Sequence, residues 1–163
     1  MDIMSTGGVI GFAMEAAEKG LLKVPSEIDL QFGNVQAAEY LIRGMALQEN
    51  SLGCLLSNGV QQAALKIGEN SQDFAQHTKG LETPAWGPRG ALGTGLAFMT
   101  ADRGGCHQRG LPAPIEIVYG QYNGRQVDPL STTGKAAMVI EMQNFSAGSD
   151  ALVKCDFSTA AIQ

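Results

Sequence analysis

The segment from Asp102 to Gly110 concentrates more chemically useful side chains than any other part of the sequence. It combines an acid, two guanidinium groups, a thiol and an imidazole with glycines, as Asp102, Arg103, Cys106, His107 and Arg109 among Gly104, Gly105 and Gly110. Glycine accepts a positive φ and lets the backbone approach a ligand closely. The segment therefore predicts a loop that brings polar side chains against a flat or anionic ligand.

Three side chains of this loop have both a functional and a structural interpretation. An imidazole donates or accepts a proton near neutral pH, so His107 suits proton transfer as well as a structural role. Arg103 and Arg109 flank it, and paired guanidinium groups bind phosphate or planar acceptors in a fork. Two solvated surface arginines explain the same pattern equally well.

Other candidate residues are isolated in the sequence. A helix cap or a surface charge is the better interpretation of Asp2 and of Asp150, and a small buried side chain is that of Cys155. No residue that could act with His77 in catalysis or metal binding lies at a characteristic sequence spacing from it, so His77 is interpreted as structural. The sequence contains no nucleophile elbow, Walker loop, HExxH or GxGxxG pattern, which removes the basis for the common hydrolase, NTPase and dinucleotide-binding interpretations.

Helices must position most of these residues. Apolar residues at helical spacing, with caps and glycines at the ends, predict helices from Ser5 or Thr6 to Gly20, Asn34 to Met45, Asn50 to Gly68, Ala91 to Ala101, and Ser131 to Phe145 before Gly148. Prolines make 78–88 an extended connection, and 115–119 is either a short strand or an extended arm. The predicted fold class is mainly α, an irregular helical bundle with long Gly/Pro-rich connections.

Composition limits the classes of partner. The net charge of −5 argues against nucleic acid, because binding a phosphate backbone requires a basic face. No run approaches the roughly 20 apolar residues of a membrane span, and the first residues lack a signal-peptide pattern, so a cytoplasmic protein is expected. The three cysteines are widely spaced and predict neither a disulfide framework nor a self-contained zinc site. Only 17% of residues are charged, which indicates burial against a partner.

A resemblance extends over nearly the whole chain. It is carried by 2–10, 12–15, 18–20, 64–68, 79–85, 88–90, 95–97, 103–107, 128–132 and 134–136, which read DIMSTGGVI, FAME, EKG, ALKIG, KGLETPA, PRG, GLA, RGGCH, DPLST and GKA. In this order the strings resemble the C-terminal part of the tungsten-containing aldehyde ferredoxin oxidoreductase family. The resemblance assigns roughly 1–76 to the end of that family's second domain and 77–163 to an incomplete third domain, both mainly helical.

The resemblance implies an activity and its cofactors. A tungsten held by two pterin dithiolenes, beside a [4Fe–4S] cluster, would oxidise an aldehyde to a carboxylic acid and pass the electrons to ferredoxin. Further implied partners are the family's N-terminal domain and a second copy of the chain in a homo-oligomer. Two alternatives stay open: a family branch acting on another substrate, such as an aromatic acyl-CoA, and a non-catalytic truncated or scaffold protein.

The same resemblance implies roles for single residues. Each pterin is contacted by an Asp-x-x-Gly-Leu-(Cys or Asp) motif, whose first copy would end in Met1 and Asp2 and whose second would run from Asp150 to Cys155, a cluster ligand. Arg103 and Arg109 would contact the pterins, Asp156 would join the cofactor-binding set, and His107 would lie near the metal as a proton donor, acceptor or hydrogen-bond partner. Cys106 is expected to be structural. The sequence departs from the family pattern at Gly87, commonly Asp, and at Val153 and Lys154, commonly Gly-Leu.

Cysteine number leads to a first prediction. A [4Fe–4S] cluster takes four thiolates, whereas this chain has three cysteines and one of them at a motif position. The purified 163-residue protein should therefore contain neither stoichiometric tungsten nor stoichiometric iron, and should not oxidise aldehydes. Elemental analysis that found one tungsten and four irons per chain would contradict this expectation.

Overall fold

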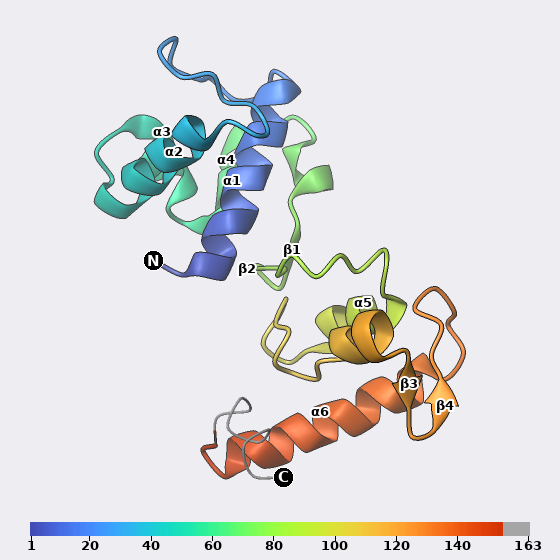
Figure 1. Cartoon of the computed structure of the whole chain (residues 1–163). Helices are drawn as coiled ribbons and strands as arrows, with labels where there is room; N and C mark the ends of the chain where they lie inside the picture. Colours follow the sequence, from blue (N-terminus) through green and yellow to red (C-terminus); the bar gives the residue numbers. More distant parts are fainter. Residues whose placement is uncertain (155–163) are drawn as a thin grey trace. The chain divides into compact units, whose positions relative to one another are not determined.

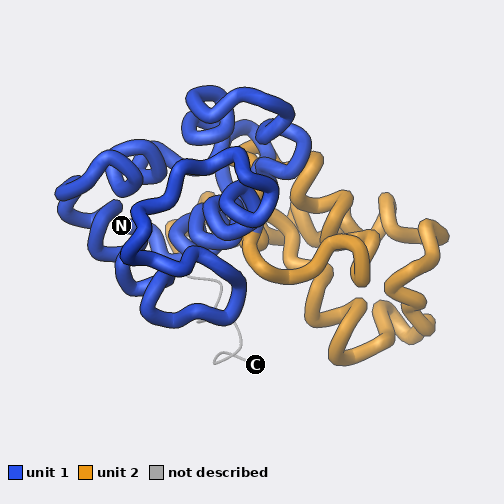
Figure 2. Tube along the Cα trace, turned by 90° about the horizontal axis from the view of Figure 1, so that it is seen from above, with its two compact units in different colours: residues 1–83 blue, residues 84–163 orange. Residues whose placement is uncertain are grey.

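A computed structural model describes residues 1–154 of the chain and is mainly helical, which confirms the predicted fold class. The chain forms two compact units, unit 1 from Met1 to Thr83 and unit 2 from Pro84 to Gln163 (Figure 2). The boundary predicted from the resemblance, between 76 and 77, lies a few residues earlier. The assignment of the units to the second and third domains of a family stays a prediction. Among the described residues, no helix is long and apolar enough to cross a membrane.

Unit 1 consists of four helices, a 3₁₀ turn and a small hairpin (Figure 1). Its elements are α1 (Ile3–Glu18), α2 (Val35–Leu47), α3 (Ser51–Leu56), α4 (Gly59–Ile67), η1 (Ser71–Phe74), β1 (His77–Thr78) and β2 (Leu81–Glu82). The two strands pair antiparallel. The helices enclose one apolar core that includes Val9, Phe12, Leu41, Leu56 and Val60.

The first helix begins earlier than predicted. Ser5 or Thr6 was expected to cap it, but Asp2 is the N-cap, and its Oδ1 accepts the Ser5 N–H at 2.7 Å. A carboxylate at the N-cap satisfies a backbone donor of the first turn that otherwise lacks a partner. Ser5 and Thr6 therefore lie inside the first turn. The caps predicted at Asn34 and Asn50 are confirmed, since each amide oxygen accepts a backbone N–H three residues later.

The segment predicted as a single helix from Asn50 to Gly68 is divided into α3 and α4. Gly59 begins α4 with a φ of +85°, which is strained for any residue with a Cβ. Gly53 is required for a different reason, because a Cβ there would lie 2.2 Å from the carbonyl oxygen of Gly44 in α2. Gly59 therefore marks the point where one helix ends and the next begins, and Gly53 marks a close contact between α3 and α2.

A buried glutamate supplies the missing cap of α4. Asn58 makes no side-chain cap hydrogen bond, and the N–H of Val60 donates to Glu82 Oε1 at 2.6 Å. Glu82 is 5% exposed and comes from strand β2. A buried carboxylate is tolerated only where hydrogen bonds compensate its lost hydration. The hairpin is thereby tied to the start of a helix that precedes it in the chain.

The described part of unit 2, residues 84–154, contains two helices, a π-helical turn and a second hairpin (Figure 1). Its elements are α5 (Leu92–Thr100), η2 (Ile115–Tyr119), β3 (Gln121–Tyr122), β4 (Arg125–Gln126) and α6 (Lys135–Ala151). The prediction of a strand or extended arm at 115–119 is wrong, because these residues form the turn η2. The last helix begins at Lys135 rather than near Ser131, and it continues past Gly148.

Glu116 explains why 115–119 is a turn. Its carboxylate accepts the N–H of Gly93 and the N–H of Thr94 at 2.8 Å each, and the Thr94 hydroxyl at 2.9 Å. Lys135 Nζ, at the start of α6, donates to the same carboxylate as a buried ion pair. Ala91, the N-cap of α5, makes no side-chain cap hydrogen bond. Glu116 therefore joins the first turns of α5 and α6 from the turn η2.

Substitution of Gly93 tests this arrangement. A Cβ at Gly93 would lie 2.8 Å from Glu116 Oε1, so Gly93→Ala should destabilise the protein by about 2 kcal/mol and lower Tm by roughly 4–8 °C. The matched control is Gly148→Ala in α6, where nothing lies within 4 Å of the new Cβ. That change should stabilise the helix by about 0.5–1 kcal/mol. Equal Tm values for the two variants in thermal unfolding would contradict the cap at Glu116.

Candidate functional site

The loop from Asp102 to Gly110 follows α5 directly and is packed into unit 2. Cys106 and its two preceding glycines are buried, which agrees with a structural role for the thiol. Gly104 and Gly110 have positive φ values of 112° and 96°. A Cβ at Gly110 would lie 2.9 Å from Gln143 Cγ on α6. The glycines thus allow the loop to turn sharply and to lie against α6. The predicted close approach of this backbone to a ligand stays a prediction.

Arg109 lies between two carboxylates. Its Nε is 3.4 Å from Asp102 Oδ1, and its Nη1 forms an ion pair with Asp150 Oδ2 on α6. The Nε atom is buried and has no hydrogen-bond partner of good geometry. The structure therefore brings together two residues from the predicted cofactor-binding set, Arg109 and Asp150. Arg103 is exposed on the same loop, and its backbone N–H donates to Asp102 Oδ1 at 2.9 Å.

His107 is half-buried beside an aromatic residue. The centroid of its ring is 6.3 Å from that of Trp86, with the planes tilted by 31°. Removal from water disfavours the charged imidazolium and lowers the pKa of His107 below its ordinary value of 6.5. The imidazole is therefore neutral at pH 7, with one nitrogen able to donate a hydrogen bond and the other able to accept one.

A cavity of about 530 Å³ opens beside His107, and residues of unit 2 alone line it. Its walls include His107, Leu111, Ile115, Tyr122, Met142 and Phe145. The volume is within the roughly 300–1,000 Å³ of small-molecule sites, which are also mainly apolar with a few polar groups. The loop histidine thus faces a space in which a small organic molecule could lie.

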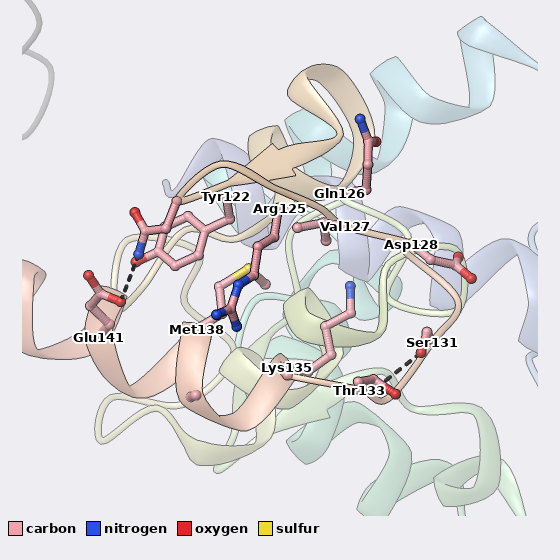
Figure 3. A pocket seen from close by; sticks show the side chains of 13 residues that line it. Tyr122, Arg125, Gln126, Val127, Asp128, Ser131, Thr133, Lys135, Met138 and Glu141 are labelled. Carbon is pink, nitrogen blue, oxygen red and sulfur yellow. Dashed lines mark hydrogen bonds between the residues drawn. The ribbon is translucent and has the colours of Figure 1, made fainter.

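A second cavity of unit 2 is more polar. It measures about 560 Å³ and lies between the β3–β4 hairpin and the start of α6, with Arg125 and Lys135 among its lining residues (Figure 3). Lys135 is already paired with Glu116, and no residue of the loop from Asp102 to Gly110 lines this cavity. The sequence interpretation singled out neither cavity. The polar cavity is lined by residues between Tyr122 and Glu141, and the apolar one by residues between His107 and Ser146, so each depends on how α6 packs against the preceding segment rather than on a local motif.

The predicted residues at the start of the chain lie in unit 1. Met1 and Asp2 are exposed, and both line a further cavity of about 430 Å³. The pKa of Asp2 is lowered, first by the hydrogen bond from the Ser5 backbone. This carboxylate is therefore an ionised acceptor at neutral pH. Of the two structural interpretations of Asp2, helix cap and surface charge, the structure shows the helix cap, whereas the contact of Asp2 with a pterin stays a prediction.

The residues present fit a pterin better than they fit a metal cluster. The Asp150 carboxylate is 42% exposed, so it remains accessible to N–H donors, and Arg109 Nε is a buried donor without a hydrogen bond. Within residues 1–154, no group of three or more His, Cys, Asp or Glu side chains could hold a metal ion. Cys155 and Asp156, predicted as a cluster ligand and a cofactor contact, lie outside the described residues.

Comparison with known proteins gives matches over the whole chain. A family model described as "Aldehyde ferredoxin oxidoreductase, domains 2 & 3" matches residues 1–163. Tungsten-containing aldehyde ferredoxin oxidoreductases from Pyrococcus horikoshii and Thermococcus kodakarensis are each 36% identical over 98% of the chain. The aliphatic sulfonate oxidoreductase, WOR-like subunit, of Pyrococcus furiosus is 27% identical over 91% of it. The chain spans about a quarter of the length of these relatives, 26% in each case.

Titration of His107 tests its placement. Its C2–H signal in ¹H NMR should titrate with a midpoint below 6.5, and Trp86→Ala, which lets water reach the ring, should raise that midpoint toward 6.5. Because the folded-state pKa is depressed, His107 contributes stability above pH 6.5 that is lost as pH falls through the folded pKa. A midpoint at or above 6.5 in the unchanged protein would contradict this burial.

Proposed function

The chain belongs to the aldehyde ferredoxin oxidoreductase family, and from this we propose that it is the domain 2 and 3 portion of a tungsten-dependent oxidoreductase. The complete enzyme would oxidise an aldehyde and water to a carboxylic acid, two protons and two electrons, with ferredoxin as the electron acceptor. The observation that carries the proposal is the family match over residues 1–163, which includes the loop that holds His107 beside a cavity.

We assign the binding of the pterin portion to the polar residues around Arg109. The exposed carboxylate of Asp150 would accept hydrogen bonds from the amino-pyrimidine edge, and Arg109 would donate to an acceptor atom. Asp102 would hold the Arg109 guanidinium in place while Arg109 and Asp150 turn from each other to the pterin. When bound, the tungsten cofactor supplies the two-electron oxidation itself. Arg103, Met1, Asp2 and Asp156 complete the proposed set of cofactor contacts.

The iron–sulfur ligands require more chain than is present. Four thiolates are needed and the sequence contains three cysteines, of which Cys54 is exposed in unit 1 and Cys106 is buried in unit 2. We propose that Cys155 contributes one ligand and that the family's first domain contributes the others. By this proposal the 163-residue protein alone is inactive.

His107 is proposed as the catalytic residue that handles the proton. Its lowered pKa keeps the imidazole neutral at pH 7, so one nitrogen can accept a proton from the attacking water. The other can donate a hydrogen bond to the substrate oxygen as negative charge develops there. General acid–base catalysis of this kind contributes about 10²–10⁴-fold to the rate.

A second candidate function is oxidation of a different substrate on the same scaffold. The similarity to the aliphatic sulfonate oxidoreductase, WOR-like subunit, favours it, although identity falls from 36% to 27%. The two candidates differ in the charge of the substrate. A sulfonate is anionic, whereas an aldehyde group is neutral, so the electrostatics of the cavity beside His107 discriminate between them.

Replacement of His107 tests the proposed mechanism. In the complete enzyme that contains this chain, His107→Gln should lower kcat for aldehyde oxidation by about 10²–10⁴-fold and leave tungsten content unchanged. The matched control is His77→Gln, because His77 lies in the β1–β2 hairpin of unit 1, where its Nδ1 accepts the Gly80 N–H at 3.2 Å. Retained turnover in the His107 variant would remove this histidine from the mechanism.

A further inference from the structure

The buried ammonium group of Lys135 has more hydrogen-bond donors than the residues around it accept. Lys135 is 4% exposed and begins α6, and its Nζ atom carries three N–H donors. Among residues 1–154, Glu116 is its one acceptor. That carboxylate also accepts the backbone N–H groups of Gly93 and Thr94 and the Thr94 hydroxyl, which fills its roughly four acceptor positions. The remaining donors of Lys135 therefore need an acceptor from outside this network, because a buried charge without one is costly.

The polar cavity of unit 2 is the space beside this lysine. Its volume of about 560 Å³ is within the range of small-molecule sites, and Lys135 of α6 and Arg125 of β4 both line it. The Arg125 guanidinium makes no ion pair and no side-chain hydrogen bond with the described residues. Figure 3 shows the two cationic side chains near the middle of the lining residues, with Glu141 and Asp128 at opposite ends. Two cations with unused donors thus line the middle of one cavity.

The two carboxylates of the cavity have partners of their own. Glu141 Oε2 accepts the Asn123 amide at 3.4 Å, and Asp128 Oδ1 accepts the backbone N–H of Leu130 at 2.9 Å. Within the described part of the chain, neither carboxylate forms an ion pair with the two cations of the cavity. Each carboxylate keeps lone pairs that can accept a hydroxyl group. An anionic group therefore suits the middle of the cavity, and hydroxyl groups suit its ends.

We infer that this cavity binds a small hydroxylated anion, either a carboxylate or a phosphate ester. Its anionic group accepts hydrogen bonds from Lys135 and from Arg125, whose guanidinium fork matches the oxygens of a carboxylate or a phosphate. The first turn of α6 lies at the same cavity, and the helix dipole favours negative charge there. No residue of the loop from Asp102 to Gly110 lines this cavity, so the inference is independent of the proposed function.

Two pairs of probes with matched carbon chains test this inference. Tartrate and threitol have the same carbon chain and differ in their carboxylates, whereas glycerol phosphate and glycerol differ in the phosphate. In amide-resolved NMR of the 163-residue protein at constant ionic strength, at least one of the two anions should shift signals of Ser131, Thr133 and Gly134. Its neutral partner should bind at least about tenfold more weakly, because hydrogen bonds to a charged group are lost. The anion that binds identifies the carboxylate or the phosphate as the recognised group.

Substitution of Arg125 removes one of the two cations and leaves the buried ion pair of Lys135 intact. Arg125 is exposed on a hairpin, so Arg125→Gln should keep the Tm of the unchanged protein and bind the anion at least about tenfold more weakly. The matched control is Arg43→Gln in α2 of unit 1, which changes the net charge equally and should leave binding unchanged. Lys135 is observed without substitution, because its loss would leave the Glu116 carboxylate buried and unpaired. Its ¹⁵Nζ signal should shift with the same Kd as the amide signals.

Each outcome decides the inference. Failure of both anions to bind, or equal binding of an anion and its neutral partner, would overturn it. Binding that persists unchanged in Arg125→Gln, or that leaves the Lys135 signal unmoved, would overturn it as well. Because the chain has a net charge of −5, binding that is lost in Arg125→Gln and kept in Arg43→Gln would support a local site rather than general attraction. Aldehyde oxidation by the complete enzyme enters none of these results, so the proposed function stands or fails separately.

Discussion

Buried carboxylates at helix N-termini are the interactions on which both units depend. Glu82 accepts the backbone N–H of Val60, and Glu116 accepts those of Gly93 and Thr94, so each glutamate caps a helix from a distant element. Burial of an ionised carboxylate costs on the order of several kcal/mol, and hydrogen bonds must compensate that cost. The positive end of the helix dipole adds a favourable field. Each glutamate therefore stabilises the start of the helix beside it.

This constraint extends to the candidate site through α5 and α6. Glu116 joins the first turns of both helices through Thr94 and Lys135. The loop that contains His107 leaves the end of α5 and contacts α6 through Gly110. Glu116 joins the starts of both helices, and the loop is connected to one of them, α5, and packs against the other, α6. His107, on this loop, is half-buried beside a mainly apolar cavity, and its burial lowers its pKa.

The chain divides the chemistry of the proposed enzyme between two kinds of residue. Polar side chains around Arg109 are suited to a cofactor, since Asp102 and Asp150 flank the guanidinium and Asp150 stays accessible. The side chains around His107 are mainly apolar and are suited to a substrate. Among residues 1–154, no cluster of metal ligands accompanies them.

The sequence by itself determined the family, through the order of its short matching strings. It also determined the mainly helical class and the helix starts at Asn34 and Asn50, because capping and helical periodicity depend on neighbours within a few residues. It also identified the loop around His107 by composition. Only the tertiary structure decided that α3 and α4 are separate helices, that 115–119 is a turn rather than a strand, and that a cavity lies beside the histidine. The physical reason is distance along the chain. Glu116 reaches donors 22 and 23 residues away, and a contact of that separation overrides the local strand preference of its own segment.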